Sequence, residues 1–468
     1  MRDWSPERVA RAAGARLVAP GGAAPGRGDR DDAPGPSATP EPGPPGPSAT
    51  PGPPGPSGVT IDSRSVRPGD LFVGLPGRRV AGGRYAEQAL AHGAWGVLVA
   101  PEHAPAVRSA AARGGAVLAS EQPLAALQQL ARAWRRELGA QVVGITGSTG
   151  KTSTKDLLAA MLAQDRRVVA SAQNLNTEIG LPLTILGAPP GTQALVLEMA
   201  MRGPGQIAEL AAIAEPDVGV IVNVGPVHLE LLGSLEAVAA AKAELIAGLE
   251  PGATAVLPAG EPLLHAHLRD DVDIVTFGAG GDVARLPADL TLPFASAHMV
   301  GNALAALAAA RAIGARPRGP LEVQLSALRG QRIELPCSLL VIDDCYNANP
   351  MSMRAALDDL ALSAAGRRVA VLGDMLELGP QEGRYHEEIG AYARAAGVDL
   401  LVTVGPRAAR MAQAFGGEAH LAADAAEAAV LARELLRPGD TVVVKASRGV
   451  GLEVVAQSLR AGAAAIRD

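Results

Sequence analysis

The stretch QVVGITGSTGKTSTKDLL, residues 141–158, combines residue types at a spacing that suits phosphate binding. Its glycines would let backbone N–H groups close around phosphate oxygens, and the following helix would add unpaired N–H donors and the positive end of its dipole. Lys151 would neutralise the β- and γ-phosphates of a nucleotide, and the Thr152 hydroxyl would bind Mg²⁺. The residues that this loop offers to a nucleotide are Gly147, Ser148, Thr149, Gly150, Lys151 and Thr152.

The loop has the spacing Gly-x-x-Gly-Lys-Thr, which is shorter than the usual phosphate-loop pattern because Gly144 lies one residue too far upstream. A turn rich in Gly, Ser and Thr without any function is the alternative. The apolar residues before the loop predict a short buried strand, and residues 153–162 predict a helix. Because strand, Lys-Thr pair and helix come in the required order, we favour an ATP site of a particular kind.

Glu198 directly follows the apolar run 194–197, which predicts a buried strand. Ligands of open α/β sheets gather at the carboxyl ends of the strands, so this carboxylate is expected near the phosphate loop. Mg²⁺ prefers oxygen ligands, and Thr152, Glu198 and phosphate oxygens would supply them. The alternative is an exposed glutamate at a strand end.

Two further residues, His228 and Lys242, stand out by their positions. His228 comes shortly after the predicted strand 218–222, at the same edge as Glu198, although a lone histidine is more often structural than a ligand. Lys242 lies on the apolar side of the predicted helix 235–249, where an unpaired ammonium is unfavourable. Burial would lower its pKa and leave a nucleophilic amine, which can add CO₂ to form an anionic carbamate. The alternative is a lysine that extends from the edge of the stripe into solvent.

Polar residues also follow two strands in the last third of the chain. The segment 343–350, DDCYNANP, separates a predicted strand from a predicted helix and would suit contacts to ribose or phosphate. A helix-capping turn accounts for Asn349 and Ser352 nearly as well. Lys445 and Arg448 mark the end of another strand, and both cations could face an anionic substrate.

The elements that would position these residues alternate between strand and helix. Alternation across 140–316 predicts a mostly parallel sheet covered on both faces, and 317–468 repeats the pattern as a Rossmann-like α/β domain without a dinucleotide fingerprint. Residues 1–139 predict a smaller α/β domain, so the fold class is α/β with three domains. The predicted strands are 96–99, 142–145, 194–197, 218–222, 255–257, 274–277, 339–342, 368–372, 400–404 and 441–445. The predicted helices are 124–138, 153–162, 206–214, 235–249, 299–313 and 352–362.

Length and composition exclude several classes of protein. A chain of 468 residues is too long for one core, and its net charge of −6 gives no general footprint for nucleic acid. No apolar run reaches the roughly 18 residues that a membrane span needs, so we expect no membrane insertion. Cys337 and Cys345 provide neither a disulfide framework nor a four-cysteine zinc site. We therefore expect free thiols in a reducing cytoplasm.

The N-terminal region contains one segment of unusual composition. Residues 5–7, Ser-Pro-Glu, predict a helix start, because a capping hydroxyl is followed by proline in the first turn and then by an acid. Between 20 and 58 the sequence consists mainly of Pro, Gly, Ser, Ala and Thr. We interpret this segment as a disordered insertion rather than a site.

Several segments carry a resemblance to a known family. In chain order they read GITGSTGKTSTKD, EMAMRGPGQI, NVGPVHLELLGS, AKAEL, HMVGNALAA, DDCYNANPMSM, VLGDMLELG and VKASRGVGLE. They resemble the ATP-dependent Mur ligases, most closely those that join D-alanyl-D-alanine to UDP-N-acetylmuramoyl-tripeptide. The segment IDSRSVRPGDLFVGLPG resembles the family's N-terminal domain, which holds the UDP end of the substrate. The resemblance covers nearly the whole chain apart from 20–58.

The resemblance implies roles for individual residues. Lys151 and Thr152 match the family's phosphate-loop residues, and Glu198 matches its first magnesium ligand. His228 matches a ligand of a second magnesium, and Lys242 matches the lysine that is carbamylated to bind that metal, which replaces the solvent-facing alternative. Matches to nucleotide-binding positions are Asn302, Arg332, Asp344 and Asn347. Residues assigned to the substrate are Ser63, Asn174, Asn176, Glu178, Lys445 and Arg448.

The resemblance also implies an activity. ATP would phosphorylate the terminal carboxylate of UDP-N-acetylmuramoyl-tripeptide, and the amine of D-alanyl-D-alanine would attack the resulting acyl phosphate. The implied cofactors are ATP, two Mg²⁺ ions and a CO₂-derived carbamate on Lys242. We expect a cytoplasmic monomer that takes part in peptidoglycan precursor synthesis.

A departure from the family pattern at residues 81–83 and three alternatives accompany this interpretation. Residues 81–83 read Ala-Gly-Gly where the family usually has Asp-Gly-His, so both polar side chains are missing. The ligase that adds the third amino acid is an alternative, although its Asp-Asn-Pro-Arg signature is absent and residues 347–350 read Asn-Ala-Asn-Pro. A folylpolyglutamate-type or cyanophycin-type ligase fits the segments less well. A phosphate-loop ATPase or binding module without ligation is the alternative from another class.

Overall fold

The computed structural model describes residues 1–21, 55–77, 79–111 and 114–462. The chain divides into two compact units, and it passes between them three times, after residues 139, 177 and 191. The first unit comprises Met1–Gly139 with Glu178–Gly191, and the second comprises Ala140–Thr177 with Thr192–Asp468. The predicted domain boundaries after 139 and 316 stay predictions. Most of the predicted insertion 20–58 lies outside the described residues.

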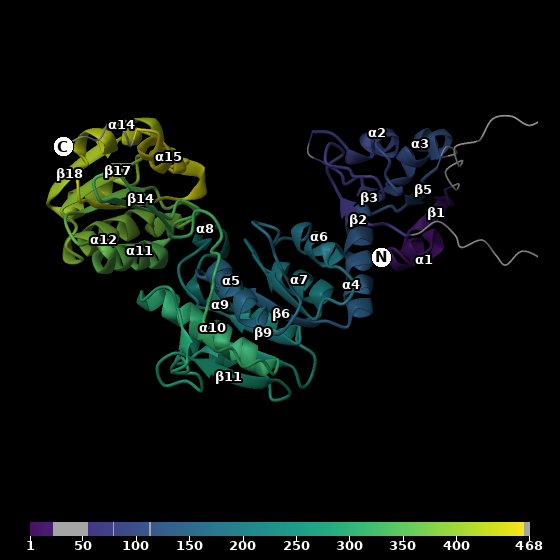
Figure 1. Cartoon of the computed structure of the whole chain (residues 1–468), viewed down its shortest axis with the longest axis horizontal. Coiled ribbons are helices and arrows are strands. Elements are labelled where there is room, and N and C mark those ends of the chain that lie inside the picture. Colours follow the sequence, from purple (N-terminus) through teal and green to yellow (C-terminus); the bar gives the residue numbers. More distant parts are fainter. Residues whose placement is uncertain (22–54, 78, 112–113, 463–468) are drawn as a thin grey trace, which may run out of the picture. The chain divides into compact units, whose positions relative to one another are not determined.

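The first unit is built on one sheet. Its described strands are β1 (Arg16–Ala19), β2 (Gly58–Thr60), β3 (Asp70–Val73), β4 (Gly96–Val99) and β5 (Ala116–Ala119). Its described helices include α1 (Pro6–Ala12), α2 (Ala86–Ala91), α3 (Ala104–Ala111), α4 (Pro123–Leu138) and α6 (Gly180–Gly187). The order is β1-β5-β4-β3-β2, with β2 to β5 parallel and β1 antiparallel to β5 (Figure 1). Phe72, Val97 and Val107 belong to the core between the sheet and its helices.

Helix α4 shows why a later segment joins the first unit. Its Leu127 and Leu130 are fully buried, and Gly139 ends the helix in the left-handed conformation, at φ +59°. The indole N–H of Trp134 donates a hydrogen bond of 3.0 Å to the carbonyl of Ala188, just after α6. The second passage of the chain through the first unit therefore supplies packing partners for α4.

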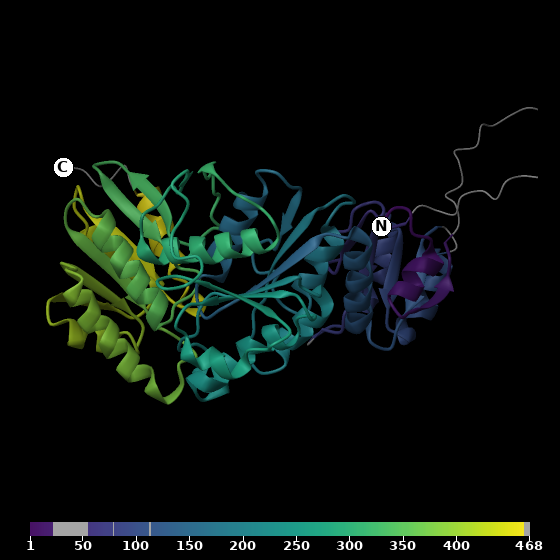
Figure 2. The same ribbon diagram turned by 90° about the horizontal axis from the view of Figure 1, so that it is seen from below.

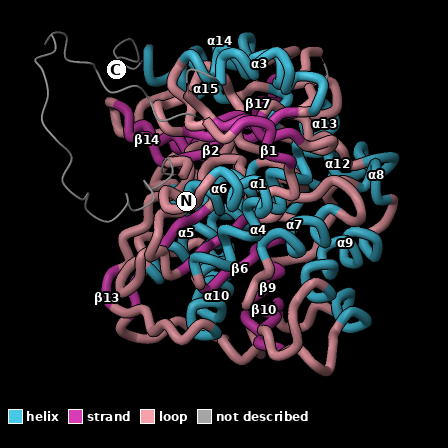
Figure 3. The backbone as a smooth tube through the Cα atoms, turned by 90° about the vertical axis from the view of Figure 1, so that its right-hand side faces the viewer, coloured by secondary structure: helices cyan, strands magenta, loops and turns pink. Residues whose placement is uncertain are grey.

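The second unit contains two six-stranded sheets in the part that is described. The first consists of β6 (Gln141–Thr146), β7 (Val168–Ala170), β8 (Ala194–Glu198), β9 (Val218–Ile221), β10 (Thr254–Pro258) and β11 (Asp273–Phe277). Its helices include α5 (Lys151–Leu162), α7 (Gln206–Ala214), α8 (Leu229–Leu232), α9 (Leu235–Ala247) and α10 (Ala297–Ala312). The order β11-β10-β9-β6-β8-β7 is parallel throughout. The core on one face includes residues of α5 and α10, and a separate core on the other face includes residues of α9. Figure 3 labels these three helices together with β6, β9 and β10.

The position of β6 in this order decides where a ligand would bind. From β6 the chain runs to β7 and back to β8 on one side of β6, and it then crosses to β9 on the other side, so the direction of winding reverses at β6. Such a reversal opens a crevice at the carboxyl ends of the strands, which is where α/β proteins bind ligands. The predicted phosphate loop follows β6 directly at this point.

The second sheet of this unit has mixed strand directions. Its strands are β14 (Gln331–Leu335), β15 (Leu339–Asp343), β16 (Arg368–Gly373), β17 (Leu400–Val404), β18 (Glu418–Ala422) and β19 (Thr441–Lys445). Its helices include α11 (Pro350–Ser363), α12 (Glu382–Ala395), α13 (Ala409–Phe415), α14 (Ala425–Leu435) and α15 (Glu453–Ala461). The order is β14-β15-β19-β16-β17-β18, with β14 antiparallel and the others parallel. Helices cover both faces, α14 and α15 on one and α11 to α13 on the other. Figure 1 labels most of these helices, and Figure 2 shows the same part of the chain, coloured green to yellow, from below.

The α/β fold class with parallel sheets is confirmed, and each predicted strand and helix has a counterpart. Helix α5 begins at Lys151, two residues earlier than predicted, because Gly150 takes up the left-handed conformation at φ +76° and leads straight into the helix. The elements that were not predicted include strands β1, β7, β14 and β18 and helix α6. No helix among the described residues has the length and apolar character that a membrane crossing demands.

Candidate active site

The phosphate loop is braced by an asparagine from the neighbouring strand. Asn223, two residues beyond β9, accepts hydrogen bonds at Oδ1 from the backbone N–H groups of Ser148 (3.1 Å) and Thr149 (2.9 Å). Its Nδ2 donates to the carbonyl of Thr149 at 3.2 Å, and the Ser148 hydroxyl donates to the carbonyl of Gly225 at 3.0 Å. The loop is therefore held in shape by β9, on one side of β6.

Lys151 lies at the start of α5 and points back into the loop. Its Nζ donates a hydrogen bond of 2.8 Å to the carbonyl of Gly147. Burial lowers the pKa of Lys151, the charge of Glu198 opposes this shift, and the nearby charge of Arg329 adds to it. The ammonium thus interacts electrostatically with a buried carboxylate and with a second cation.

Thr152 and Glu198 meet as the sequence predicts. The Thr152 hydroxyl donates to Glu198 Oε2 at 2.8 Å, and Asn176 Nδ2 donates to Oε1 at 2.8 Å. The backbone N–H of Glu198 donates to the Ser171 hydroxyl at 3.1 Å. Glu198 is 2% exposed, so the alternative of a solvent-exposed strand-end glutamate is wrong. Both of its carboxylate oxygens are fixed in space by neighbours.

Lys242 is one of the largest fully enclosed side chains in the described structure. It projects from α9 and is 2% exposed, so the alternative of a lysine that reaches solvent is wrong. Burial, and then the charge of Lys151, lower the pKa of Lys242 well below its ordinary value. Within the described residues its amine has no carboxylate or hydrogen-bonding partner.

His228 caps the short helix α8 in a left-handed conformation, at φ +52°. Its Nδ1 lies 2.5 Å from Oε2 of Glu377, which itself has φ +63°. Burial lowers the pKa of His228, Glu377 raises it, and Lys151 and Lys242 lower it further. Lys151 and Lys242 thus act on the pKa of His228, and Glu198 acts on that of Lys151, so the four side chains lie within electrostatic range of one another, as the sequence predicts.

Around the phosphate loop, the side chains of Thr152 and Glu198 suit Mg²⁺, whereas the unmodified amine of Lys242 does not. In the part of the chain that is described, no three His, Cys, Asp or Glu side chains come together as a metal-binding group. The Thr152 hydroxyl and the Glu198 carboxylate are buried oxygen ligands in contact, which fits Mg²⁺ completed by phosphate oxygens. Lys242 fits a metal only after its amine has become an anionic group.

The polar side chain of Asn302 packs against the phosphate loop. It lies on α10 and is 7% exposed, and its Nδ2 is 3.8 Å from the sulfur of Met299. A Cβ at Gly150 would stand only 2.4 Å from its Oδ1, so the amide packs directly on the loop. The match to a nucleotide-contacting position stays a prediction, and the contact with Gly150 supports it.

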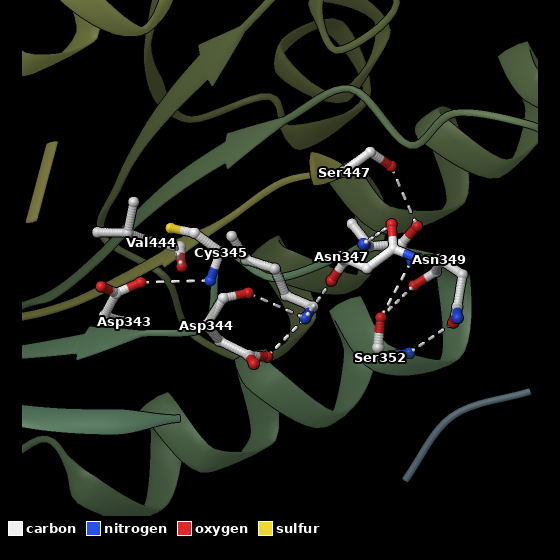
Figure 4. A network of polar contacts seen from close by, with 10 residues as sticks. Asp343, Asp344, Cys345, Asn347, Asn349, Ser352, Val444 and Ser447 are labelled. Atoms are coloured by element: carbon white, nitrogen blue, oxygen red, sulfur yellow. Dashed lines mark hydrogen bonds and ion pairs between the residues drawn. The ribbon is translucent and has the colours of Figure 1, made fainter. Parts of the chain in front are cut away.

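The predicted nucleotide segment after β15 forms a tight network (Figure 4). Lys445 Nζ donates to Asp344 Oδ2 at 2.5 Å and to the carbonyl of Asn347 at 2.9 Å. Lys445 is 1% exposed, so its charge is engaged by this turn, and its predicted contact with substrate stays a prediction. Asn349 and Ser352 form a capping box at the start of α11, as the capping alternative expects.

Two arginines near the start of the second sheet differ in their contacts and in their effect on Lys151. Arg332, on β14, donates to Asp359 at 3.0 Å and to the Ser363 hydroxyl at 2.8 Å. Arg329, which was not predicted to have a role, places its guanidinium 3.9 Å from the ring centre of Tyr346, and its charge affects Lys151. Of these two arginines, only Arg329 is among the charges that shift the pKa of Lys151.

The remaining predicted substrate residues are dispersed. Ser63 is 8% exposed and follows β2 in the first unit. Asn174 and Glu178 are exposed, the former in the second unit and the latter in the first. Arg448 lies 3.5 Å from Glu453 and is largely exposed. Cys345 is buried and Cys337 is partly exposed, and both are free thiols.

Comparison with known proteins identifies the family. Family models match in three stretches: "Mur ligase family, catalytic domain" over 56–135, "Mur ligase middle domain" over 145–310, and "Mur ligase, glutamate ligase domain" over 328–448. The UDP-N-acetylmuramoyl-tripeptide–D-alanyl-D-alanine ligase of Bacillus subtilis is 35% identical over 436 residues, covering 86% of this chain and 93% of the relative. The chain belongs to the Mur ligase family.

Other members of the family agree with this assignment. The ligase of the same name from Escherichia coli is 32% identical to this Mur ligase over 433 residues, covering 86% of the chain and 93% of the relative. The crystal structure of MurF ligase from Thermotoga maritima in complex with ADP superposes with a TM-score of 0.76 at 30% identity, covering 87% of this chain and 98% of that one. The three-domain α/β architecture of Mur ligases therefore applies to this chain.

Several contacts at the site were not predicted from the sequence. Asn223 lies in the segment NVGPVH, and Glu377 lies in VLGDMLELG. Both segments had been noted for their resemblance to the family, and both follow predicted strands, which is the signal that could have identified them. Ser171 follows β7, a strand of three residues that was not predicted, so no pattern pointed to it.

Proposed function

We propose that this Mur ligase joins the amine of D-alanyl-D-alanine to the terminal carboxylate of UDP-N-acetylmuramoyl-tripeptide, converting ATP to ADP and phosphate during peptidoglycan precursor synthesis. The relatives from Bacillus subtilis and Escherichia coli are named for this reaction and align with 86% of the chain. The observation that carries the ATP-dependent step is the buried contact between Thr152 and Glu198 beside Lys151. The Thermotoga maritima relative in complex with ADP supports the use of ATP.

The reaction has two steps. In the first, a carboxylate oxygen of the tripeptide attacks the γ-phosphorus of ATP, the bond to the β–γ bridging oxygen breaks, and ADP leaves. In the second, the neutral amine of D-alanyl-D-alanine attacks the carbonyl carbon, phosphate leaves, and the surplus proton passes to solvent. Lys151 and the loop N–H groups offset the repulsion between the carboxylate and the γ-phosphate. Exclusion of water would protect the acyl phosphate from hydrolysis.

The residues present fit one magnesium ion directly and a second one only once Lys242 carries a carbamate. Thr152 and Glu198 would hold one ion, and His228 with a carbamylated Lys242 would hold the second. Bound Mg²⁺ would neutralise negative charge on the phosphates. Carbamate formation requires a neutral amine and CO₂, and burial beside Lys151 favours the neutral amine of Lys242. The carbamate would also introduce a negative charge that attracts the ammonium of Lys151.

The other site assignments remain part of this proposal. The first unit would hold the UDP end of the substrate, and the enzyme would act as a cytoplasmic monomer. The proposed nucleotide contacts are Gly147, Ser148, Thr149, Gly150, Asn302, Arg332, Asp344 and Asn347. The proposed substrate contacts are Ser63, Asn174, Asn176, Glu178, Lys445 and Arg448.

Phosphate release in the presence of ATP and Mg²⁺ tests the reaction. We expect release only when UDP-N-acetylmuramoyl-tripeptide and D-alanyl-D-alanine are both present, with one phosphate for each amide bond formed. A panel of single amino acids against UDP-N-acetylmuramoyl-dipeptide tests the preceding ligase of the pathway as the alternative. ATP hydrolysis that is indifferent to all of these substrates would refute ligation and favour a nucleotide-driven binding module.

A further inference from the structure

Two oppositely charged neighbours on α5 are buried close to the candidate active site and have no role in the reaction described above. The side chains of Lys155 and Asp156 are 4% and 10% exposed, and Nζ of the lysine lies 2.7 Å from Oδ1 of the aspartate. The next two residues of the helix, Leu157 and Leu158, are fully buried. Replacing such a buried ion pair with apolar residues is often neutral or stabilising. Stability alone therefore does not account for charged residues at these positions.

Lys155 also reaches the residue that supports Glu198. Its Nζ donates a hydrogen bond of 2.8 Å to the carbonyl of Ser171, which directly follows β7. The Ser171 hydroxyl accepts the backbone N–H of Glu198 at 3.1 Å, and the Ser171 N–H donates to the carbonyl of Val196 at 3.0 Å. Lys155 thus fixes the residue that holds the end of β8 through two hydrogen bonds.

These contacts close a ring that contains both buried oxygen ligands. The Thr152 hydroxyl donates to Glu198 Oε2, and the Glu198 N–H donates to Ser171. Lys155 then joins Ser171 back to α5, three residues after Thr152. Because residues three apart lie on one side of a helix, the ring sets the separation between the start of α5 and the end of β8. That separation decides whether a hydroxyl and a carboxylate can bind one cation together.

Asp156 holds the lysine in this ring and is itself anchored by another segment. Its Oδ2 accepts the backbone N–H of Ser326 at 2.9 Å, and its Oδ1 accepts the Ser326 hydroxyl at 3.3 Å. Ser326 belongs to the segment 321–330, which leads into β14. The carboxylate is therefore fixed in space, and the direction in which it draws the Lys155 ammonium is fixed with it.

We propose that the Lys155–Asp156 ion pair positions Glu198 for magnesium binding. This inference rests on the proposed function, which assigns Mg²⁺ to that carboxylate. Lys155 and Asp156 are positioning residues, because they act through Ser171 and touch neither the ion nor ATP. Loss of the pair should leave the phosphate loop able to bind a nucleotide, since Asn223 braces that loop separately from β9. It should weaken only the additional binding that Mg²⁺ provides.

Calorimetric titration of the full-length chain with ADP, at a series of Mg²⁺ concentrations, tests this role without requiring turnover. Lys155→Met removes the charge and fills similar space. We expect ADP affinity without Mg²⁺ to be unchanged. The Mg²⁺ concentration that gives half of the Mg²⁺-dependent gain in affinity should rise about tenfold, as for other residues that orient a metal ligand. In ligation assays, the half-saturating Mg²⁺ concentration should rise by a similar factor, with the KM for D-alanyl-D-alanine unchanged.

Arg367→Met is the matched control, because it breaks another buried ion pair of the second unit. Arg367 lies 2.9 Å from the buried carboxylate of Asp440, and the two residues directly precede β16 and β19. Lys155→Met and Arg367→Met both leave a buried aspartate without its cation, so both should lower the melting temperature. Only Lys155→Met should change the Mg²⁺ requirement. An equal change in Arg367→Met would attribute the effect to lost stability and overturn the inference.

The double variant Lys155→Met/Asp156→Asn decides the question if the single variant does not fold, as judged by its thermal transition. It leaves no unpaired charge at this position, and the new amide oxygen can still accept from Ser326. We expect the double variant to regain the melting temperature of the unmodified chain and to keep the raised Mg²⁺ requirement.

The outcomes separate this inference from the proposed function. An unchanged Mg²⁺ requirement in a folded variant overturns the inference, as does an equal loss of ADP affinity with and without Mg²⁺. ADP binding by the unmodified chain that does not respond to Mg²⁺ overturns it too. A raised Mg²⁺ requirement for ADP binding, in a chain whose unmodified form ligates none of the substrates, leaves the inference standing and refutes the function.

Discussion

The two sides of the candidate active site differ in how complete they are. On the Glu198 side, both carboxylate oxygens have hydrogen-bond donors, Thr152 and Asn176, each at 2.8 Å. On the Lys242 side, the amine of Lys242 has no partner among the described residues, and the charge that shifts its pKa is that of another lysine, Lys151. One side is assembled by folding alone, whereas the other needs a chemical change before it can bind a cation.

The two sides of the site also differ in which segments of the chain position their side chains. Thr152, Asn176 and Glu198 belong to segments around β6, β7 and β8 of one sheet. His228 is oriented by Glu377, which follows β16 of the other sheet, and both residues have left-handed backbones. Non-glycine residues in this conformation persist only where their surroundings enforce it. The Lys242 side therefore depends on residues from a distant part of the chain.

The largest effect should come from the assembled side. Glu198→Ala removes the carboxylate that Thr152 contacts, and we expect ligation to fall by about 10³-fold or more while the fold is retained. Lys151→Ala should have an effect of similar size. Phosphate release and circular dichroism are the measurements, with Glu250→Ala as an exposed control. Near-normal turnover in either variant would contradict the site assignment.

The second prediction addresses the chemical change on the other side. Lys242→Ala should reduce ligation by about 10²-fold, and Lys242→Arg should not restore it because a guanidinium does not form the carbamate. The unmodified enzyme should lose activity in CO₂-depleted buffer and regain it with bicarbonate. Mass spectrometry under native conditions would detect the added mass of the carbamate. Activity that is independent of CO₂ would argue that Lys242 acts as an unmodified amine.

The third prediction concerns the support for His228. Glu377→Gln keeps the size of the side chain but removes its charge, and we expect about a tenfold loss of ligation, typical of residues that orient a metal ligand. ADP affinity should change little, because Glu377 contacts neither the phosphate loop nor Glu198 in the described structure. Glu230→Gln, an exposed residue near the same turn, serves as the control. If Glu377→Gln and Glu230→Gln reduced ligation equally, the data would contradict a specific role for Glu377.

The smallest expected effect is the contribution of Lys242 to the pH dependence of folding stability. Burial lowers the pKa of Lys242, so between that lowered value and 10.5 the folded chain binds fewer protons than the unfolded chain. In CO₂-free buffer, stability should therefore rise with pH in this interval. Lys242→Met should remove this dependence and raise the melting temperature at pH 7 by about 2 °C, as measured by calorimetry. A lower melting temperature in Lys242→Met would indicate that the amine has a stabilising partner.

The sequence predicted the parts of this site that depend on local pattern. The strand-loop-helix order placed Lys151 and Thr152, and the helical spacing placed Lys242 on the apolar side of its helix, although the spacing alone left open that its amine reaches solvent. Glu198 was predicted because parallel strands bring their carboxyl ends together. These inferences need only periodicity and strand order, which are properties of neighbouring residues.

Contacts between distant segments could not be predicted in this way. Spacing does not reveal that Asn223 braces the phosphate loop, or that His103 fills the space beside Gly83, because each pairing is decided by how two loops pack. Lys445 was predicted to face substrate because it ends a strand, whereas its burial depends on the turn that Asp344 begins. Helix α6, GLPLTILG, was missed because it is apolar on every side and contains glycine and proline, so it has no helical period.

The return of α6 to the first unit has a consequence for synthesis on the ribosome. The first unit cannot complete its packing until residue 191 has been translated, because α4 lacks α6 before then. By that time β6 and α5 have already been made, but β8 and β9, which pair with the two sides of β6, have not. The nascent chain therefore carries a central strand with both edges open, and this interval is when a nascent-chain chaperone would have the most to protect.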